Sequence, residues 1–196
     1  MPVQFFIAFY RSGVPMKYHW VLVATDDGIP SSTEPIKCFE IMQERILDDT
    51  GPEPIVVPVW ETQLGKRTQL SDKTSNFRGL VMFPPCTDES VTLESVYDVL
   101  ENVPAMPPSI ANSKDERKRQ DWTCAKWIID ILLEFGPIWG LEFNRSMNTE
   151  TMLYYEIYKQ AHKLDEAFGS PTRREYAKDG SLVNCVPFPQ EYVEMA

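Results

Sequence analysis

Hydrophobic residues are densest near the start of the chain, where they form two nearly continuous runs. Residues 3–10 are rich in Phe and Ile, and residues 17–24 read KYHWVLVA. Short runs of aromatic and β-branched residues between turn signals are typical of strands. The turn residues RSGVP at 11–15 separate the two runs. The pattern therefore predicts a hairpin of two strands, although a connection of this length does not fix its register.

Three later segments, residues 36–42, 55–60 and 77–83, have the same hydrophobic character. Pro58 lies in the second of them and cannot donate a backbone hydrogen bond, so we expect this strand at a sheet edge or at a bulge. Residues 64–76 are polar and predict a mobile loop. Together with the first two runs, the three segments predict an antiparallel sheet of about five strands.

Three other stretches show the three- and four-residue spacing of amphipathic helices. They cover residues 88–102, a stretch that begins near Cys124 and ends at Gly136, and residues 148–168. We therefore expect an α+β fold in which helices pack on the sheet. A chain of 196 residues suits one domain with a substantial core, which we place at 1–168. A polar, proline-containing tail without periodicity follows at 169–196.

The last of these helices carries a row of large side chains near one face. The row consists of Met152, Tyr155, Tyr158 and His162. An aromatic stripe at this spacing lies in a protein core more often than in a cofactor site, so we expect it to face the sheet. His162 lies in the last third of the helix, where we expect it to be exposed.

The charge balance limits the classes of partner. The chain carries 29 acidic and 19 basic residues, a formal net charge of −10. Nucleic acids and anionic membrane surfaces are polyanions, so this balance disfavours both as partners. It leaves open a neutral or cationic small molecule or a peptide.

Motifs for metals, cofactors and export are missing from the sequence. The four cysteines form neither a CxxC pair nor a cluster with histidine, so we expect no zinc site. There is no P-loop and no Gly-rich dinucleotide fingerprint, and we expect no cofactor. The apolar run at the amino terminus lacks a basic leader and is too short to span a bilayer. We therefore expect a cytoplasmic protein with reduced thiols and no stable membrane insertion.

Cys124 is the candidate nucleophile. It lies in the segment DWTCAKWIIDIL at 121–132, where Asp121 and Thr123 are both candidates for the N-cap of the helix. Cys124 should then fall in the first turn, where unpaired backbone N–H groups and the helix dipole stabilise a thiolate. The alternative is that Cys124 is a small buried hydrophobe. A base within reach would decide between the two.

His19 is the better candidate for that base. Alternation along the second strand places His19, Val21 and Val23 on one face. A single histidine in a strand is more often structural than catalytic. The only other histidine, His162, lies in a polar helix, so His19 is the better imidazole partner for Cys124.

These two segments together resemble a known family. YHWVLVATDDG at 18–28, followed by DWTCAKWIIDIL at 121–132, is similar to the circularly permuted branch of the papain-like superfamily. That branch includes lecithin:retinol acyltransferase-like proteins and relatives of bacterial cell-wall endopeptidases. The layout also resembles a group of small fungal proteins with a Tyr-His-Trp strand and a later cysteine helix. The resemblance extends loosely over 3–135 and implies a permuted papain-like fold with a Cys–His pair.

The resemblance also concerns a third residue. Enzymes of this branch usually carry a polar residue, often a second histidine, on the strand after the first histidine. The corresponding strand here has no histidine, and Glu40 is the best substitute, with Cys38 or Gln43 as alternatives. The oxyanion of a reaction intermediate could be held by the amide of Cys124 and a second donor, for which Gln120 is a guess.

We therefore expect a cysteine-dependent hydrolase or acyltransferase that acts on an amide, ester or thioester carbonyl. In this hypothesis Cys124 attacks, His19 transfers the proton and Glu40 orients the ring. Two alternatives remain from the sequence. One is a non-catalytic papain-like module that binds a small molecule or a protein, and the other is a biosynthetic accessory isomerase or cyclase.

Overall fold

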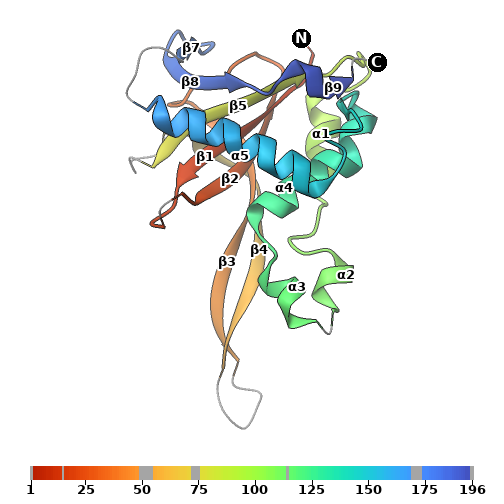
Figure 1. The fold of residues 1–196 in the computed structure, drawn as a ribbon. Helices are drawn as coiled ribbons and strands as arrows, with labels where there is room; N and C mark the ends of the chain where they lie inside the picture. Colours follow the sequence, from red (N-terminus) through yellow and green to blue (C-terminus); the bar gives the residue numbers. More distant parts are fainter. Residues whose placement is uncertain are drawn as a thin grey trace.

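The first two hydrophobic runs form neighbouring strands at the centre of the sheet in the computed structural model (Figure 1). β1 (Gln4–Arg11) and β2 (Tyr18–Thr25) pair antiparallel along their whole length, with Gln4 opposite Thr25 and Arg11 opposite Tyr18. The predicted hairpin is therefore present. The structure describes residues 2–14, 16–48, 55–71, 76–113, 115–168 and 174–194.

Among the described residues the sheet is mixed and has seven strands in the order β4-β3-β2-β1-β5-β8-β7. The remaining strands are β3 (Pro35–Asp48), β4 (Ile55–Gln69), β5 (Phe77–Pro85), β7 (Arg174–Tyr176) and β8 (Leu182–Pro187). β8 pairs parallel to β5 and antiparallel to β7. A separate two-stranded sheet joins β6 (Glu142–Phe143) to β9 (Val193–Glu194).

The predicted sheet of about five antiparallel strands was too small, because it left out β7 and β8. Both strands come from the segment that we expected to be a polar tail. All of β7 is exposed, so its sequence has no alternation to detect. β8 is buried through its pairing with β5, about a hundred residues earlier in the chain.

The predicted loop at 64–76 was wrong over 64–69, because β4 continues through Gln69, and residues 72–75 lie outside the described residues. β3 and β4 form a long hairpin whose register runs from Pro35–Gln69 to Asp48–Ile55. Strand pairing requires backbone groups rather than apolar side chains, so a polar segment can extend a hairpin. β4 lies at an edge of the sheet, as Pro58 predicted.

Helices follow the first five strands along the chain. They are α1 (Leu93–Leu100), α2 (Pro108–Ala111), α3 (Glu116–Gln120), α4 (Cys124–Phe135), the 3-10 turn η1 (Gly136–Trp139) and α5 (Glu150–Glu166); a further 3-10 turn, η3 (Gln190–Tyr192), precedes β9. α1 begins later than the expected residue 88, because Thr92 and Ser95 form a capping box at its start. None of the helices among the described residues combines the length and the apolar character needed to cross a membrane.

Our prediction that the aromatic row of α5 faces the core was wrong for Met152 and Tyr155, whereas Tyr158 is partly buried and packs against the core. Met152 and Tyr155 are 44% and 65% exposed, respectively. The buried positions are instead Leu153, Glu156, Ile157, Gln160, Ala161 and Leu164. The aliphatic residues in this set determine the orientation of the helix, and they are less conspicuous in the sequence than the aromatic row.

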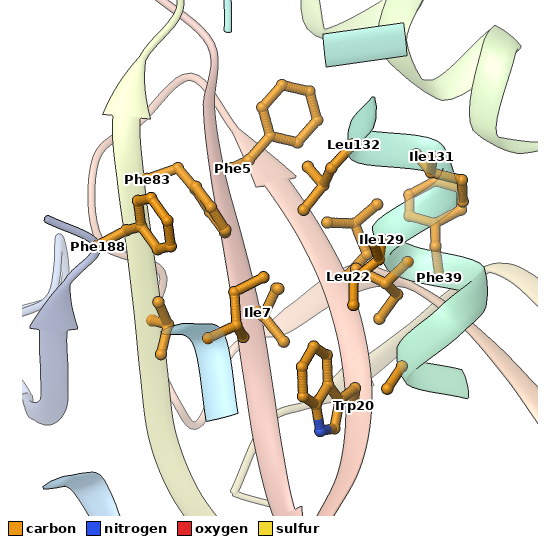
Figure 2. Packing of buried hydrophobic residues seen from close by; sticks show 14 of the residues in the cluster. Phe5, Ile7, Trp20, Leu22, Phe39, Phe83, Ile129, Ile131, Leu132 and Phe188 are labelled. Carbon is orange, nitrogen blue, oxygen red and sulfur yellow. The ribbon is translucent and has the colours of Figure 1, made fainter. Parts of the chain in front are cut away.

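The core lies between the sheet and the helices. Figure 2 shows Ile7 and Leu22 from the strands close to Ile129 and Leu132 of α4. The opposite face of the sheet has a second cluster that includes residues such as Phe6 and carries no helix residues. β1 contributes to both clusters and is buried on both faces, which explains why its hydrophobic run is continuous rather than alternating.

Candidate functional site

Cys124 is the first residue of α4. The side chain of Thr123 caps the helix by accepting a hydrogen bond of 3.2 Å from the backbone N–H of Lys126. Asp121, the other N-cap candidate, instead ends α3 as its C-cap. The expected place of Cys124 in the first helical turn is therefore observed.

The four thiols differ in their surroundings. None is in a disulfide; Cys124 is partly exposed, whereas Cys38, Cys86 and Cys185 are only 2%, 3% and 3% exposed. Burial raises the pKa of Cys38 and of Cys185 to about 12 and the pKa of Cys86 to about 11. These three thiols are therefore protonated at neutral pH and shielded from reagents.

The strands that carry His19 and Glu40 separate next to Cys124. β2 and β3 pair only at Leu22–Phe39 and Val23–Cys38. Beyond these positions β3 continues in its hairpin with β4, whereas residues 18–21 of β2 pair only with β1 among the described strands. α4 contacts both β2 and β3. Figure 1 shows the β3–β4 hairpin extending away from the rest of the sheet, with α3 and the start of α4 on the same side.

His19 is the centre of the site. Its Nε2 atom forms a hydrogen-bonded ion pair with Oε2 of Glu40, and the two side chains are 31% and 20% exposed. The side chain of Cys124 lies near the same imidazole and is one of the causes that raise the pKa of His19. One ring therefore interacts with both of the other predicted site residues.

Two opposing effects set the protonation of His19. Burial disfavours the imidazolium and lowers its pKa. Hydrogen bonding to Cys124 and Glu40, together with the charges of these groups, outweighs burial and raises the pKa of His19 to about 10. The ring is therefore positively charged at neutral pH.

The alternatives to Glu40 and the guess for the oxyanion donor lie elsewhere. Cys38 is buried in the second core cluster, and Gln43 is exposed on the β3–β4 hairpin. Gln120 is the exposed last residue of α3. His162, which we expected to be exposed, is half-buried and packs edge-on against Tyr18 and Tyr158.

Tyr154 approaches the site from α5, which the sequence did not predict. Its ring stacks on Trp20, the neighbour of His19 in β2, with 5.5 Å between ring centroids. Burial, followed by the charges of Tyr158 and Cys124, raises the pKa of Tyr154. No sequence motif connects this residue with Cys124, because only the packing of α5 brings the two together.

A depression of about 310 Å³ borders the histidine. His19 and Glu40 line it together with Arg11, Met42 and Gln69, among others. These residues belong to four neighbouring strands, so the depression lies on the sheet beside the imidazole, and Cys124 is not part of its lining. No cluster of three or more potential metal ligands occurs in the described ranges.

Comparisons with known proteins identify no relative. No protein-family model, curated protein or solved structure matches the chain. The chemistry of the site is therefore inferred from its own residues and geometry.

Proposed function

We propose that this protein is a cysteine-dependent hydrolase or acyltransferase that acts on an amide, ester or thioester carbonyl. Cys124 is the nucleophile, His19 the general base and acid, and Glu40 the residue that orients the imidazole. The observation that carries the proposal is the ion pair of His19 with Glu40, together with the nearby Cys124, which also raises the pKa of the imidazole. A nucleophile, a base and an orienting group in series are the elements of covalent acyl transfer.

The reaction proceeds in two halves. Cys124 attacks the carbonyl carbon of the substrate as a thiolate beside the protonated His19, and a tetrahedral oxyanion forms. The C–N, C–O or C–S bond to the leaving group then breaks, and the leaving group takes the proton from the imidazolium. In the second half the neutral His19 deprotonates water or another acceptor, which attacks the thioester; the C–S bond breaks, and the Cys124 thiolate and the protonated His19 are restored.

The start of α4 supplies donors for the oxyanion. The N–H groups of Lys126 and Trp127 are satisfied by Thr123, through its side chain and its carbonyl oxygen. The N–H groups of Cys124 and Ala125 occupy the first two helical positions, where helix geometry provides no partner. Donors at a helix start are suited to developing negative charge, and we assign them this role.

The resemblance to the circularly permuted papain-like branch supports the choice of a carbonyl substrate. In that branch, too, a histidine on an early strand accompanies a cysteine that opens a helix. Glu40 replaces the second histidine that the branch often carries. A carboxylate serves the same purpose, because it holds the ring and stabilises the imidazolium.

Acylation of the protein tests the proposal. The chain is incubated with p-nitrophenyl acetate and with phenyl thioacetate, and the acetylated peptide is identified by mass spectrometry. We expect acetylation on Cys124, faster labelling of Cys124 than of the other thiols by iodoacetamide, and loss of turnover in Cys124→Ala and His19→Ala. Cys185→Ala is the matched control, since it removes a buried thiol and should retain turnover.

Either of two results would contradict the proposal. One is preferential alkylation of Cys38, Cys86 or Cys185 in the folded protein. The other is the absence of any acyl-enzyme with ester, thioester and amide substrates, which would leave the site as a non-catalytic scaffold. An added amine acceptor distinguishes transfer from hydrolysis, because a transferase forms mainly the amide product, whereas a hydrolase in water forms mainly the free acid.

A further inference from the structure

A second cavity, of about 600 Å³, lies between α1 and α4. Its lining comes from the end of α1, the proline-rich segment that leads into α2, Trp122 and one side of α4. This volume is within the range of small-molecule sites. The residues of the proposed reaction, Cys124, His19 and Glu40, do not line it.

The walls of the cavity offer apolar surface and few hydrogen-bond donors. Trp122 Nε1 donates to the carbonyl oxygen of Ala105 at 2.8 Å, and Trp127 Nε1 donates to that of Pro104 at 2.9 Å. Both indole N–H groups are therefore already satisfied. The proline residues in the lining have no backbone N–H. The side-chain amide of Asn102, just after the end of α1, donates to the backbone carbonyl oxygen of Asp98.

The polar groups that remain are carboxylates. Asp98, Asp130 and Glu134 line the cavity, and no Lys, Arg or His is among the described residues that do so. Asp130 and Glu134 are four residues apart on α4 and so lie on the same side of the helix. The nearby Lys126 is engaged in an ion pair with Glu150, with 3.6 Å between nitrogen and oxygen.

Asp130 is the carboxylate whose ionised form a cationic ligand would stabilise most. It is partly buried, whereas Asp98 and Glu134 are exposed. Burial and then the charges of Glu150 and Glu134 raise the pKa of Asp130, although Lys126 opposes them. A positive charge placed beside Asp130 would relieve both the desolvation and the repulsion.

We propose that this cavity binds an organic cation with an apolar body, such as an arylalkylamine. The ammonium group lies between Asp130 and Glu134, and the apolar body packs against Trp122, Trp127 and the proline residues. Anions are repelled by the carboxylates, and polar neutral molecules find too few donors. A flat aromatic body with a protonated amine matches both the indole surfaces and the charge.

Three probes with the same body and different end groups test the proposal. 4-Phenylbutylamine, 4-phenylbutanol and 4-phenylbutyrate are titrated against the full chain by calorimetry and tryptophan fluorescence. We expect the amine to bind, the alcohol to bind at least about fivefold more weakly and the carboxylate not to bind, because one close charge pair is worth about 1 kcal/mol or more. Asp130→Asn and Glu134→Gln should each weaken the amine and leave the alcohol unchanged.

Two control variants distinguish binding in this cavity from a general effect of net charge and from the proposed reaction. Glu94→Gln removes an exposed carboxylate from the first turn of α1, outside the lining, and should leave amine binding unchanged. If it weakens binding as much as Asp130→Asn, the effect is one of net charge and the proposal fails. Cys124→Ala should bind the amine as tightly as the natural chain, so the result is independent of the proposed reaction.

The proposal is overturned if the three probes bind equally or if the amine does not bind at millimolar concentration. It is also overturned if a lysine-containing peptide binds while the free amine does not, since the cavity would then serve a basic segment of a partner protein. Circular dichroism of each variant shows that a loss of binding does not come from unfolding.

Discussion

At the scale of single residues, the site depends on the charge of His19. Glu40 holds one ring nitrogen, and Cys124 interacts with the same imidazole. Both raise the pKa of His19 against the opposing effect of burial. In the proposed reaction the histidine first donates a proton to the leaving group and then accepts one from the attacking molecule.

Glu40→Gln should lower the pKa of His19. The substitution keeps the size of the side chain and a hydrogen bond but removes the charge that stabilises the imidazolium. The titration can be followed by NMR, because the chain has only two histidines and His162 provides the second resonance. We expect the pKa to move down from about 10, and the high-pH limb of any activity to move to lower pH with it.

The same shift has a consequence for stability. The pKa of His19 is raised from 6.5 to about 10 in the folded chain. The stability that the protonated ring adds to the folded state is therefore fully present below pH 6.5 and is lost as the pH rises toward 10. The unfolding temperature of the natural chain should therefore fall more over this window than that of Glu40→Gln. An unchanged titration of His19 in the variant would exclude Glu40 as the orienting residue.

At the scale of elements, the start of α4 places Cys124 and orients the amides around it. Thr123 has an extended backbone, and its hydroxyl oxygen accepts a hydrogen bond from the backbone N–H of Lys126. The helix therefore begins at Cys124. The separation of β2 from β3 then provides the space in which the helix start reaches the imidazole. The helix and the strand separation are both needed, because neither places all three side chains alone.

Thr123→Ala should destabilise the protein by about 1 kcal/mol, the usual value of an N-cap hydroxyl. It should also slow the alkylation of Cys124 by iodoacetamide, because a frayed first turn no longer holds its N–H groups toward the sulfur. Urea unfolding and the rate of labelling measure the two effects. Thr123→Ser keeps the hydroxyl and should restore both; an equal loss in the serine variant would assign the effect to the methyl group instead.

At the scale of the whole molecule, the parallel contact between β5 and β8 joins the C-terminal part of the chain to the sheet. Gly79 of β5 makes this approach possible. Its φ is +136°, and a Cβ atom there would lie 2.4 Å from the carbonyl oxygen of Asn184 in β8. No larger residue fits without moving one of the two strands.

Gly79→Ala should therefore destabilise the chain by about 2–5 kcal/mol, the sum of a strained backbone and an overpacked contact. Gly180→Ala is the matched control, since Gly180 also has a positive φ, of +80°, but has no atom within 4 Å of the added Cβ. Gly180→Ala should lower the free energy of unfolding by only about 1–2 kcal/mol. Chemical denaturation measures both, and equal losses would show that the contact with Asn184 contributes nothing.

The sequence by itself determined the features that depend on neighbouring residues. The central hairpin, the edge position of β4 and the start of α4 at Cys124 each follow from short-range patterns: hydrophobic runs, a proline and a capping residue. The sequence also selected His19 and Glu40 as partners for Cys124, although their catalytic role stays a prediction.

The tertiary structure decided what depends on residues far apart in the chain. It added β7 and β8, turned the aliphatic face of α5 inward and brought Tyr154 to the site. Strand partners and helix orientation are chosen by the total area that the whole chain buries, and no local window contains that information. The meeting of His19 with Cys124 is of this kind, since it requires β2 and β3 to separate where α4 begins.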